Sequence, residues 1–428
     1  MVSKNHDPVR LLPSEIVAIV FNNLAMRDKL ICLAVSKSWN NFLESTKTVW
    51  TTLYISRACQ PIKIKALSKY LNRSDFTVHN ALLHLESFTN KSHMTHLMDT
   101  CHGLIDLGIY GKGTFSPSQA SVLARATGIQ KLCLSQDTQV LRQTMFSMLE
   151  YCCKTLKEAK FLHLTDKATS SKPSWPKMNG LTSIHLDITS YCALDLSKLI
   201  EATPNIQSAE INNCYPYNTS RLDMTLWPDL ERLALTKTSI DYFPKLPSGL
   251  KHLILDNSCS FHLDCIDEDD DIFSLPLLET VSLENNNIDI SYIFAITESC
   301  IRANNLKTLR LGAFDIPYTS DESLCDNFPA SSTVEELSLR DLDMLDDNVL
   351  TIIELYPSLK KINLSFTLIT EVTVKELVDR GVESMIINDC DKVCDEIIKE
   401  VREKGVYISH TFMDDTTSSC GEGESDGW

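Results

Sequence analysis

Cysteine is the residue type with the widest chemistry in this 428-residue chain, and it occurs fifteen times. None of the cysteines forms a Cys-x-x-Cys pair, and the close pair late in the chain, Cys390 and Cys394, has no histidine at ligand spacing nearby. A zinc site takes four such ligands at short, regular spacing, so we expect structural thiols rather than a metal centre. The N-terminus has no apolar signal segment, because Lys4, Asp7 and Arg10 interrupt it. The thiols are therefore expected to be reduced, as in the cytoplasm or the nucleus.

Motifs for catalysis and for nucleotide binding are missing from the sequence. There is no His-Glu-x-x-His, no nucleophile elbow and no P-loop. Residues 108–113 are rich in glycine but lack both phosphate-loop spacings, which predicts a turn. The acidic run from Asp264 to Asp271 lacks the spacing of a calcium loop, which favours a solvated loop. We therefore expect no active site, no metal and no cofactor.

The net charge of −17 is unevenly distributed along the chain. Residues 1–57 carry seven Lys or Arg against four Asp or Glu, so the rest of the chain is more acidic than the total indicates. An acidic chain is unsuited to a phosphate backbone, which argues against nucleic acid as a partner. No apolar run approaches the roughly 18 residues that span a bilayer, which argues against a membrane segment. Both observations favour a protein partner, and a basic one would suit the charge.

The elements that carry these side chains follow one repeat. An apolar residue, two free positions, a second apolar residue, one free position and a third apolar residue recur fourteen times. The copies begin at Trp50, Val78, Leu104, Ile129, Leu156, Leu181, Ile206, Leu230, Leu250, Leu278, Leu306, Val334, Leu359 and Val382. Successive copies begin 20 to 28 residues apart, which is the spacing of leucine-rich repeats. One copy cannot bury its own apolar edge, so the copies must stack.

Each copy is expected to form a short strand and then a helix. Side chains alternate between the faces of a strand, so the fourth and sixth positions point into the core. Helical apolar spacing occurs at residues 345–356 and 394–401, Gly381 and Gly405 mark helix ends, and residues 405–409 are expected to add a last strand. The copy at Leu230 is too short for a full helix. The predicted fold class is therefore an α/β leucine-rich-repeat solenoid, with a parallel sheet on the concave face and helices outside.

The ninth position of several copies is a thiol or a small polar residue. It is Cys214, Thr238, Ser258, Asn286, Thr367 and Cys390 in turn. Such side chains can hydrogen-bond the backbone where it leaves a strand. A structural role is therefore expected for these cysteines.

The third, fifth and seventh positions of each copy are expected to project from the concave face. With about 4.8 Å between strands, this face would extend for roughly 60 Å, which suits a protein surface. The residues assigned to substrate binding are Arg232, His252, Glu284, Arg310, Arg340 and Lys361. Arg310, Arg340 and Lys361 come from consecutive copies, so they are expected to be neighbours and to anchor an acidic or phosphorylated peptide. The alternative is solvated charge on an exposed sheet.

The first fifty residues differ from the repeats. Pro13, Ser14 and Glu15 indicate a helix start, and apolar residues then recur on one face. Asp28 indicates a second helix start, and residues 36–43 a third helix. Three short helices bury too little surface to be stable alone, so they need either the end of the solenoid or a partner.

This segment resembles an F-box. The pattern is Leu12-Pro13-x-Glu15-Ile16-x-x-Ile19-Val20-Phe21-x-x-Leu24, then Asp28-x-Leu30, then Val35-Ser36-Lys37-x-Trp39, then Trp50. It covers Leu11 to Trp50, and Ser36 departs from the cysteine common at its position. An F-box joined to leucine-rich repeats is similar to the substrate receptors of SCF-type (cullin-RING) ubiquitin ligases.

The resemblance implies that the segment binds the S-phase-kinase-associated adaptor and, through it, the cullin and RING subunits. The implied adaptor-binding residues are Leu12, Pro13, Glu15, Ile16, Ile19, Phe21, Leu24, Leu30, Val35, Lys37 and Trp39. Trp39 and Trp50 are also implied to hold the helices to each other and to the first repeat. The chain would then be a non-catalytic substrate receptor that delivers a protein for ubiquitin conjugation and proteasomal degradation.

The expected organisation has four parts. These are an N-terminal tail at 1–9, an F-box at 10–49, a solenoid of about fourteen repeats at 50–410 and a disordered acidic tail at 411–428. The alternative for residues 10–49 is a simple cap on the exposed first edge of the sheet. A chain with only a cap would be a non-catalytic scaffold or inhibitory binding protein that acts outside a ubiquitin ligase.

Overall fold

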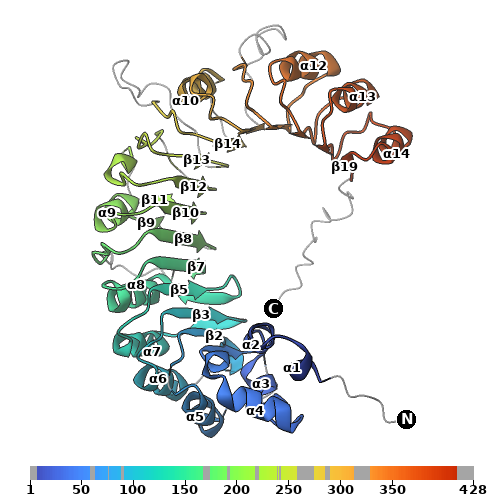
Figure 1. The fold of residues 1–428 in the computed structure, drawn as a ribbon. Coiled ribbons are helices and arrows are strands. Elements are labelled where there is room, and N and C mark those ends of the chain that lie inside the picture. The colour runs from blue at the N-terminus through green and yellow to red at the C-terminus, as the bar shows by residue number, and fades with distance from the viewer. Residues whose placement is uncertain are drawn as a thin grey trace, which may run out of the picture. The chain divides into compact units, whose positions relative to one another are not determined.

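The chain folds into two compact units, Met1–Leu250 and Lys251–Trp428. The computed structural model describes residues 7–57, 63–75, 77–87, 91–166, 174–189, 193–216, 221–238, 240, 242–257, 274–284, 290–312 and 328–411. In each unit a parallel sheet lies on one side and helices lie on the other (Figure 1). The acidic run at 264–271, the ninth-position residues Ser258 and Asn286, and the predicted tail from residue 412 onward lie outside the described residues.

The first unit begins with short helices. They are α1 (Pro8–Leu11), α2 (Ser14–Asn22), α3 (Met26–Cys32), α4 (Lys37–Ser45) and the 3₁₀-helix η1 (Lys47–Trp50). The predicted start of α2 is confirmed, with Pro13 as its N-cap. The prediction that Asp28 begins the next helix is wrong, because α3 starts two residues earlier and places Asp28 inside its first turn. A carboxylate is favourable in a first turn as well as at a cap, so the residue type alone does not separate the two positions.

The repeats of the first unit follow directly. The main ladder contains β1 (Thr52–Ile55), β2 (Asn80–His84), β3 (Asp106–Tyr110), β5 (Lys131–Leu134), β7 (Glu158–Thr165), β8 (Ser183–Ile188), β10 (Ser208–Asn212) and β12 (Arg232–Thr236). Shorter strands are β4 (Gly113–Phe115) and β6 (Thr138–Leu141), which extend the ladder beside β7, and the separate pair β9 (Ala193–Leu194) and β11 (Tyr215–Pro216). The helices are α5 (Ile64–Arg73), α6 (Lys91–Thr100), α7 (Pro117–Ala120), α8 (Arg142–Cys152) and α9 (Leu196–Ala202), with 3₁₀-helices η2 (Leu85–Ser87), η3 (Ser121–Arg125) and η4 (Met224–Leu226). The turn predicted for residues 108–113 is confined to residues 111–112, because residues 108–110 belong to β3 and residue 113 begins β4.

The second unit repeats the same plan. Its strands are β13 (His252–Ile254), β14 (Thr280–Glu284), β15 (Thr308–Gly312), β16 (Glu336–Arg340), β17 (Lys361–Asn363), β18 (Ser384–Ile386) and β19 (Tyr407–Ser409). Its helices are α10 (Ile290–Arg302), α12 (Asp346–Glu354), α13 (Glu371–Asp379) and α14 (Asp395–Glu403). The last strand, β19, confirms the prediction for residues 405–409. Within the described residues of the chain, no helix is both long and apolar enough to cross a bilayer.

The repeat register predicted from the sequence is confirmed by the strand pairing. Leu53, Ala81, Leu107, Leu132, Ala159, Ile184, Ala209 and Leu233 follow one another across the first ladder. Leu253, Val281, Leu309, Leu337, Ile362, Met385 and Ile408 do so across the second. The first, fourth and sixth positions of all fourteen copies are buried, and Leu359, at 8%, is the most exposed of them. Stacked copies therefore share a continuous apolar core, as an α/β leucine-rich-repeat solenoid requires.

The predicted helix ends are also confirmed. Gly381 and Gly405 follow α13 and α14, and each has a φ of +83°. This left-handed conformation costs glycine little, which is why glycine ends helices there. In the described residues between β12 and β13, which belong to the 20-residue copy, no helix forms.

Ninth-position side chains bond the backbone where it leaves the strands. The hydroxyl of Thr367 donates to the carbonyl of Leu364 at 2.7 Å, and the thiol of Cys390 donates to the same carbonyl at 3.1 Å. The hydroxyl of Thr238 donates to the carbonyl of Ile211 at 3.1 Å. Cys390 is therefore a structural thiol, as predicted. The sequence did not predict the backbone conformation of the residue just before the ninth position. Positive φ occurs there at Asn213, Lys237, Asn257, Asp341, Phe366 and Asp389.

Asp346 ties two neighbouring repeats of the second unit together. Its carboxylate accepts hydrogen bonds from the backbone N–H groups of Thr370 (2.9 Å) and Thr373 (3.3 Å) and from both hydroxyls (2.7 and 2.6 Å). Burial opposes ionisation, but these bonds outweigh it and lower the pKa of Asp346 below its usual value. The carboxylate therefore helps to cap α13 from the preceding repeat.

Replacing Asp346 with alanine is expected to lower the free energy of unfolding by about 1–3 kcal/mol, because two backbone donors lose their acceptor. Since the folded-state pKa is lowered, the contribution of the carboxylate is present above its usual pKa and is lost as the pH falls through the folded-state value. Urea unfolding of both proteins at neutral and acidic pH measures this. A stability difference that stays constant down to the lowest pH would contradict the account.

Candidate functional site

Residues 7–50 pack around an aromatic core. The ring of Phe21 meets Trp39 edge-on at 5.2 Å and stacks on Phe42 at 5.8 Å. The indole N–H of Trp39 donates to the carboxylate of Asp7 at 2.9 Å, and the hydroxyl of Ser38 donates to the same carboxylate. Asp7 also caps α1, where its carboxylate accepts from the N–H of Val9 at 3.1 Å. These contacts hold α1, α2 and α4 together, which is the role expected of Trp39 within the segment.

Outside this core, the segment presents large apolar side chains to solvent. They are Leu11, Leu12, Ile16, Ile19, Val20, Ile31 and Val35, each between 45% and 62% exposed. Ile16, Ile19 and Val20 share one face of α2, because residues three and four apart lie together on a helix. The opposite face of α2 supplies Val17 and Phe21 to the core. Helix α2 therefore has two apolar faces, of which only one is covered by the chain. We call the uncovered set the F-box apolar face.

Most adaptor-binding residues predicted from the sequence reach the surface. Leu12, Pro13, Glu15, Ile16, Ile19, Val35 and Lys37 are exposed, whereas Leu24, Leu30 and Trp39 are half-buried. The assignment of Phe21 to the adaptor contact is contradicted, because its ring is 3% exposed and packs between Trp39 and Phe42. Leu11, Val20 and Ile31 are also exposed, although they were not among the predicted residues, and adaptor contact stays a prediction for all of them. Val20 lies four residues after Ile16, and this spacing was the signal that could have found it.

Lys29 joins α3 to the first repeat. Its side chain is fully buried. The ammonium group donates to the carbonyl oxygens of Val49 (3.0 Å) and Thr52 (3.1 Å) and to the hydroxyl of Tyr70 (3.4 Å). Burial lowers the pKa of Lys29 to about 8. Three acceptors match the three donors of an ammonium, so the charge is buried but hydrogen-bonded.

Trp50 makes the second connection between the helices and the repeats. Its indole N–H donates to the carbonyl of Leu43 at 2.7 Å, and its ring meets Tyr70 edge-on at 5.2 Å. Leu43 belongs to α4 and Tyr70 to α5, the helix of the first repeat. Trp50 therefore holds the segment to the first repeat, as predicted.

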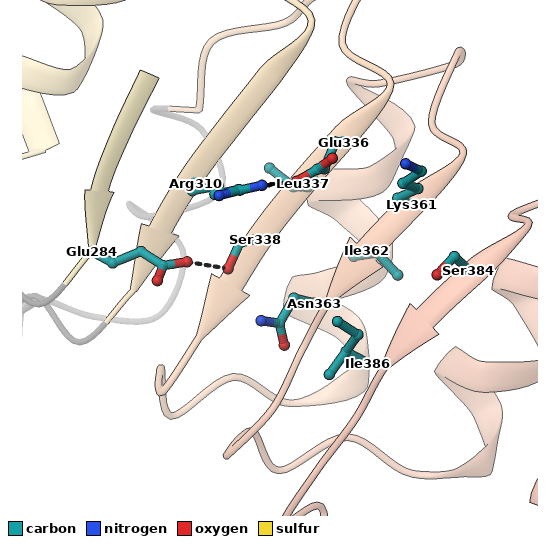
Figure 2. A pocket seen from close by; sticks show the side chains of 10 residues that line it. All are labelled: Glu284, Arg310, Glu336, Leu337, Ser338, Lys361, Ile362, Asn363, Ser384 and Ile386. Carbon is teal, nitrogen blue, oxygen red and sulfur yellow. Dashed lines mark hydrogen bonds and ion pairs between the residues drawn. The ribbon is translucent and has the colours of Figure 1, made fainter. Parts of the chain in front are cut away.

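A pocket of about 240 Å³ lies on strands β14 to β18 of the second unit (Figure 2). Arg310 and Lys361 both line it. The guanidinium of Arg310 lies 2.5 and 3.0 Å from the carboxylate of Glu336, the residue beside Lys361 in the ladder. On the other side, the carboxylate of Glu284 accepts a hydrogen bond from Ser338 at 2.7 Å. Arg310 is therefore already paired with a carboxylate, and the pocket holds two carboxylates beside its two basic residues, so its lining is less suited to a phosphate than the sequence predicted.

Arg340 lies apart from this pocket. Lys361 lies opposite Glu336 in the strand ladder, and Glu336 is four residues before Arg340 on β16. Four residues of a strand extend for about 13 Å. Arg340 instead places its guanidinium 5.3 Å from the ring centre of Phe366. Arg340 and Lys361 are therefore not neighbours, because they occupy different positions of the repeat. Arg340 does lie diagonally across the ladder from Arg310, whose strand partner Ser338 is two residues before it. A joint role of the three residues in substrate binding stays a prediction.

Arg232 and His252 begin strands in different units. Arg232 is half-buried at the start of β12. His252 starts β13, and its ring Nδ1 lies 3.2 Å from the hydroxyl of Thr280. Neither residue lines the pocket. Substrate contact stays a prediction for both.

Comparison with known proteins identifies the first segment. Residues 9–56 match the F-box-like family, whereas no curated protein has a sequence that matches the chain. Among solved structures, the chain is similar to one in the yeast Rad7 and Elc1 complex, with 15% identity over 92% of both chains and a TM-score of 0.43. It is also similar to a leucine-rich-repeat protein of Leptospira interrogans, with 13% identity over 82% of this chain and 92% of the other and a TM-score of 0.38. These structural likenesses are too weak to carry an argument. By the family match and its own fold, the protein combines an F-box-like segment with leucine-rich repeats.

Proposed function

We propose that this protein is the substrate-recognition subunit of an SCF-type ubiquitin ligase. In this proposal the F-box apolar face binds the S-phase-kinase-associated adaptor, which links it to the cullin and RING subunits. The repeats bind the protein to be ubiquitinated. The protein acts in the cytoplasm or the nucleus, where these ligases work.

The observation that carries the proposal is the F-box apolar face. A soluble chain that leaves several large apolar side chains uncovered on a few short helices has a surface suited to a partner. The match of residues 9–56 to the F-box-like family gives that partner its class. A segment that only capped the repeats would need the covered face of α2, which includes Val17 and Phe21. It would not need the F-box apolar face.

The repeats would contribute by holding a client protein close to the conjugating machinery. Binding a client beside the conjugating machinery raises the effective concentration of its lysines, without any reacting group on this chain. The contacts of Lys29 and Trp50 hold the segment and the first repeat in one arrangement. A rigid connection of this kind would keep the adaptor at a fixed place on the first unit.

Replacing Leu12 and Pro13 with alanine is expected to abolish recovery of the adaptor and cullin with the tagged protein. Both side chains are exposed, so the substitution removes contact area without opening the core. Co-purification from cells measures the interaction, and circular dichroism checks the fold.

A matched control is Leu226→Ala, which removes an equally exposed leucine from η4. This variant should recover the adaptor like the unmodified protein. Full recovery with the Leu12/Pro13 variant, or no complex between the unmodified protein and purified adaptor at micromolar concentration, defeats the proposal.

A scaffold outside the ligase is the second candidate, and the packing of α3 and η1 on the first repeat favours it. Lys29 and Trp50 cover the edge strand β1 much as a cap would. A scaffold would never bind the adaptor, and deleting residues 1–48 would make it insoluble. Adaptor binding separates the two candidates.

A further inference from the structure

The loops that leave strands β16, β17 and β18 carry a dense negative charge. Residues 341–347, 366–372 and 389–396 contain nine Asp or Glu and a single Lys. They lie in the second unit and run from the ends of the strands into the first turns of helices α12, α13 and α14 (Figure 1). We call these three loops the acidic rim.

Hydrogen bonds place the three loops side by side. The N–H of Leu368 donates to the carbonyl of Met344 at 3.0 Å, and Asp346 accepts from Thr370. The N–H of Phe366 donates to the carbonyl of Asn388 at 2.9 Å, just before the third loop. Charges that are far apart in the sequence are therefore gathered on one surface.

Two carboxylates of the rim have a partner, since Glu371 lies 3.6 Å from Lys375 and Asp395 lies 3.9 Å from the ring of His410. On the helices, Glu376 pairs with Arg380 at 2.8 Å and Glu400 with Lys404 at 2.9 Å. On the rim, none of the exposed residues Asp341, Asp343, Asp347, Asp391 and Glu396 forms an ion pair with any residue that the structure describes. Their charge is therefore available to a partner.

Large apolar side chains lie among these carboxylates. Leu345, Leu368 and Val372 are between 41% and 54% exposed. Leu345 adjoins the bond between Met344 and Leu368, and Val372 lies between the two threonines that bond Asp346. Exposed apolar groups surrounded by charge of one sign are typical of a surface that binds an amphipathic segment of opposite charge.

We propose that the acidic rim binds a basic amphipathic segment of the client protein. Apolar side chains of that segment would cover Leu345, Leu368 and Val372, and its Lys or Arg side chains would pair with the surrounding carboxylates. Nucleic acid and anionic lipid carry the same charge as the rim and are unsuited to it. A second copy of this chain could offer its own exposed apolar residues in the F-box-like segment, but the adaptor takes that face. To this extent the inference rests on the proposed function, which it extends by naming the class of client.

Fluorescence anisotropy tests the inference with the full chain bound to the adaptor. The probe is a labelled peptide with leucine and lysine at helical spacing, and peptides with glutamate in place of lysine, or serine in place of leucine, are its controls. Two rim variants are needed, Asp341→Asn/Asp343→Asn/Asp347→Asn and Leu345→Ser/Leu368→Ser/Val372→Ser. The charge-matched control is Glu150→Gln/Glu201→Gln/Asp229→Asn, which neutralises exposed carboxylates of the first unit.

Each rim variant is expected to weaken binding of the leucine–lysine peptide at least about tenfold, because apolar and charged contacts both contribute. The control variant should weaken it less than about twofold, since exposed charges outside the binding surface are screened by salt. Equal weakening by the control would show unspecific charge attraction and overturn the proposal, as would an unchanged affinity of the serine variant.

Self-association provides a further outcome. Sedimentation of the chain without the adaptor should show a monomer, and dimers that the rim variants abolish would assign the rim to a second copy instead. Adaptor recovery should be the same for all these variants. An unmodified chain that recovers the adaptor but does not bind the leucine–lysine peptide therefore defeats only this inference, whereas an unmodified chain that never binds the adaptor defeats the proposed function.

Discussion

Replacing Ile16 and Ile19 with aspartate is expected to weaken adaptor binding at least about 100-fold and to leave the thermal stability unchanged. Covering an apolar side chain of this size stabilises a complex by about 1.5–3 kcal/mol, so two losses exceed the 2.7 kcal/mol of a 100-fold change. The new carboxylates would also have to be buried without a partner. In the free chain both positions lie on the exposed face of α2, where a charge costs little. Calorimetric titration with purified adaptor measures the affinity.

The matched control is Val17→Asp, one residue along the same helix. Val17 is buried against the core, so aspartate there is expected to unfold the segment rather than to remove only the interface. If the Ile16/Ile19 variant instead lost stability like the Val17 variant, the division of α2 into a covered and an uncovered face would be wrong.

Replacing Lys29 with alanine is expected to destabilise the first unit by about 2–4 kcal/mol. The change empties the space of a fully buried side chain and leaves the carbonyl oxygens of Val49 and Thr52 without the ammonium donor. Lys29→Met fills more of the space and should cost less. Urea unfolding, followed by tryptophan fluorescence, to which the buried residue Trp50 contributes, measures both.

Lys29 is also expected to make the free energy of unfolding depend on pH, which an uncharged side chain of the same size would not do. The folded-state pKa of Lys29 is lowered to about 8, below the usual value of 10.5. Between these values the unfolded chain binds the proton and the folded chain does not, so the stability contributed by Lys29 rises with pH. Relative to Lys29→Met, the unmodified protein should gain up to about 3 kcal/mol from pH 8 to pH 10.5. Subtracting the stability of Lys29→Met at each pH cancels the contribution of groups that titrate in both proteins, such as the cysteines and the tyrosines other than Tyr70. A stability difference that stays constant with pH would contradict the buried ammonium.

Lys29 also bears on how the proposed function would work. Its acceptors come from η1 and from the first repeat, so α3 cannot turn without breaking bonds of a buried charge. We expect Lys29→Ala to change the placement of the adaptor even where the segment stays folded.

The amino-acid sequence alone was sufficient to predict the repeat and most of the surface of the F-box-like segment. Apolar residues such as Leu53, Ala81 and Leu107 occupy fixed places in each copy, and period-two alternation decides locally which side chains enter the core. Gly381 and Gly405 identified helix ends because few other residues adopt positive φ. Ile16 and Ile19 were assigned to the surface through the family pattern, and their exposure agrees with it.

Only the tertiary structure decided which residues from distant parts of the chain meet. Phe21 is apolar and helical like Ile19, and its burial depends on Trp39 and Phe42, which lie on another helix. Arg340 and Lys361 are not neighbours, because strand register, rather than order in the sequence, determines which side chains meet. Lys29 would be expected at the surface from its type, and only the acceptors from the first repeat make its burial possible. The acidic rim likewise exists only where three loops, separate in sequence, are brought together by the stacking of the repeats.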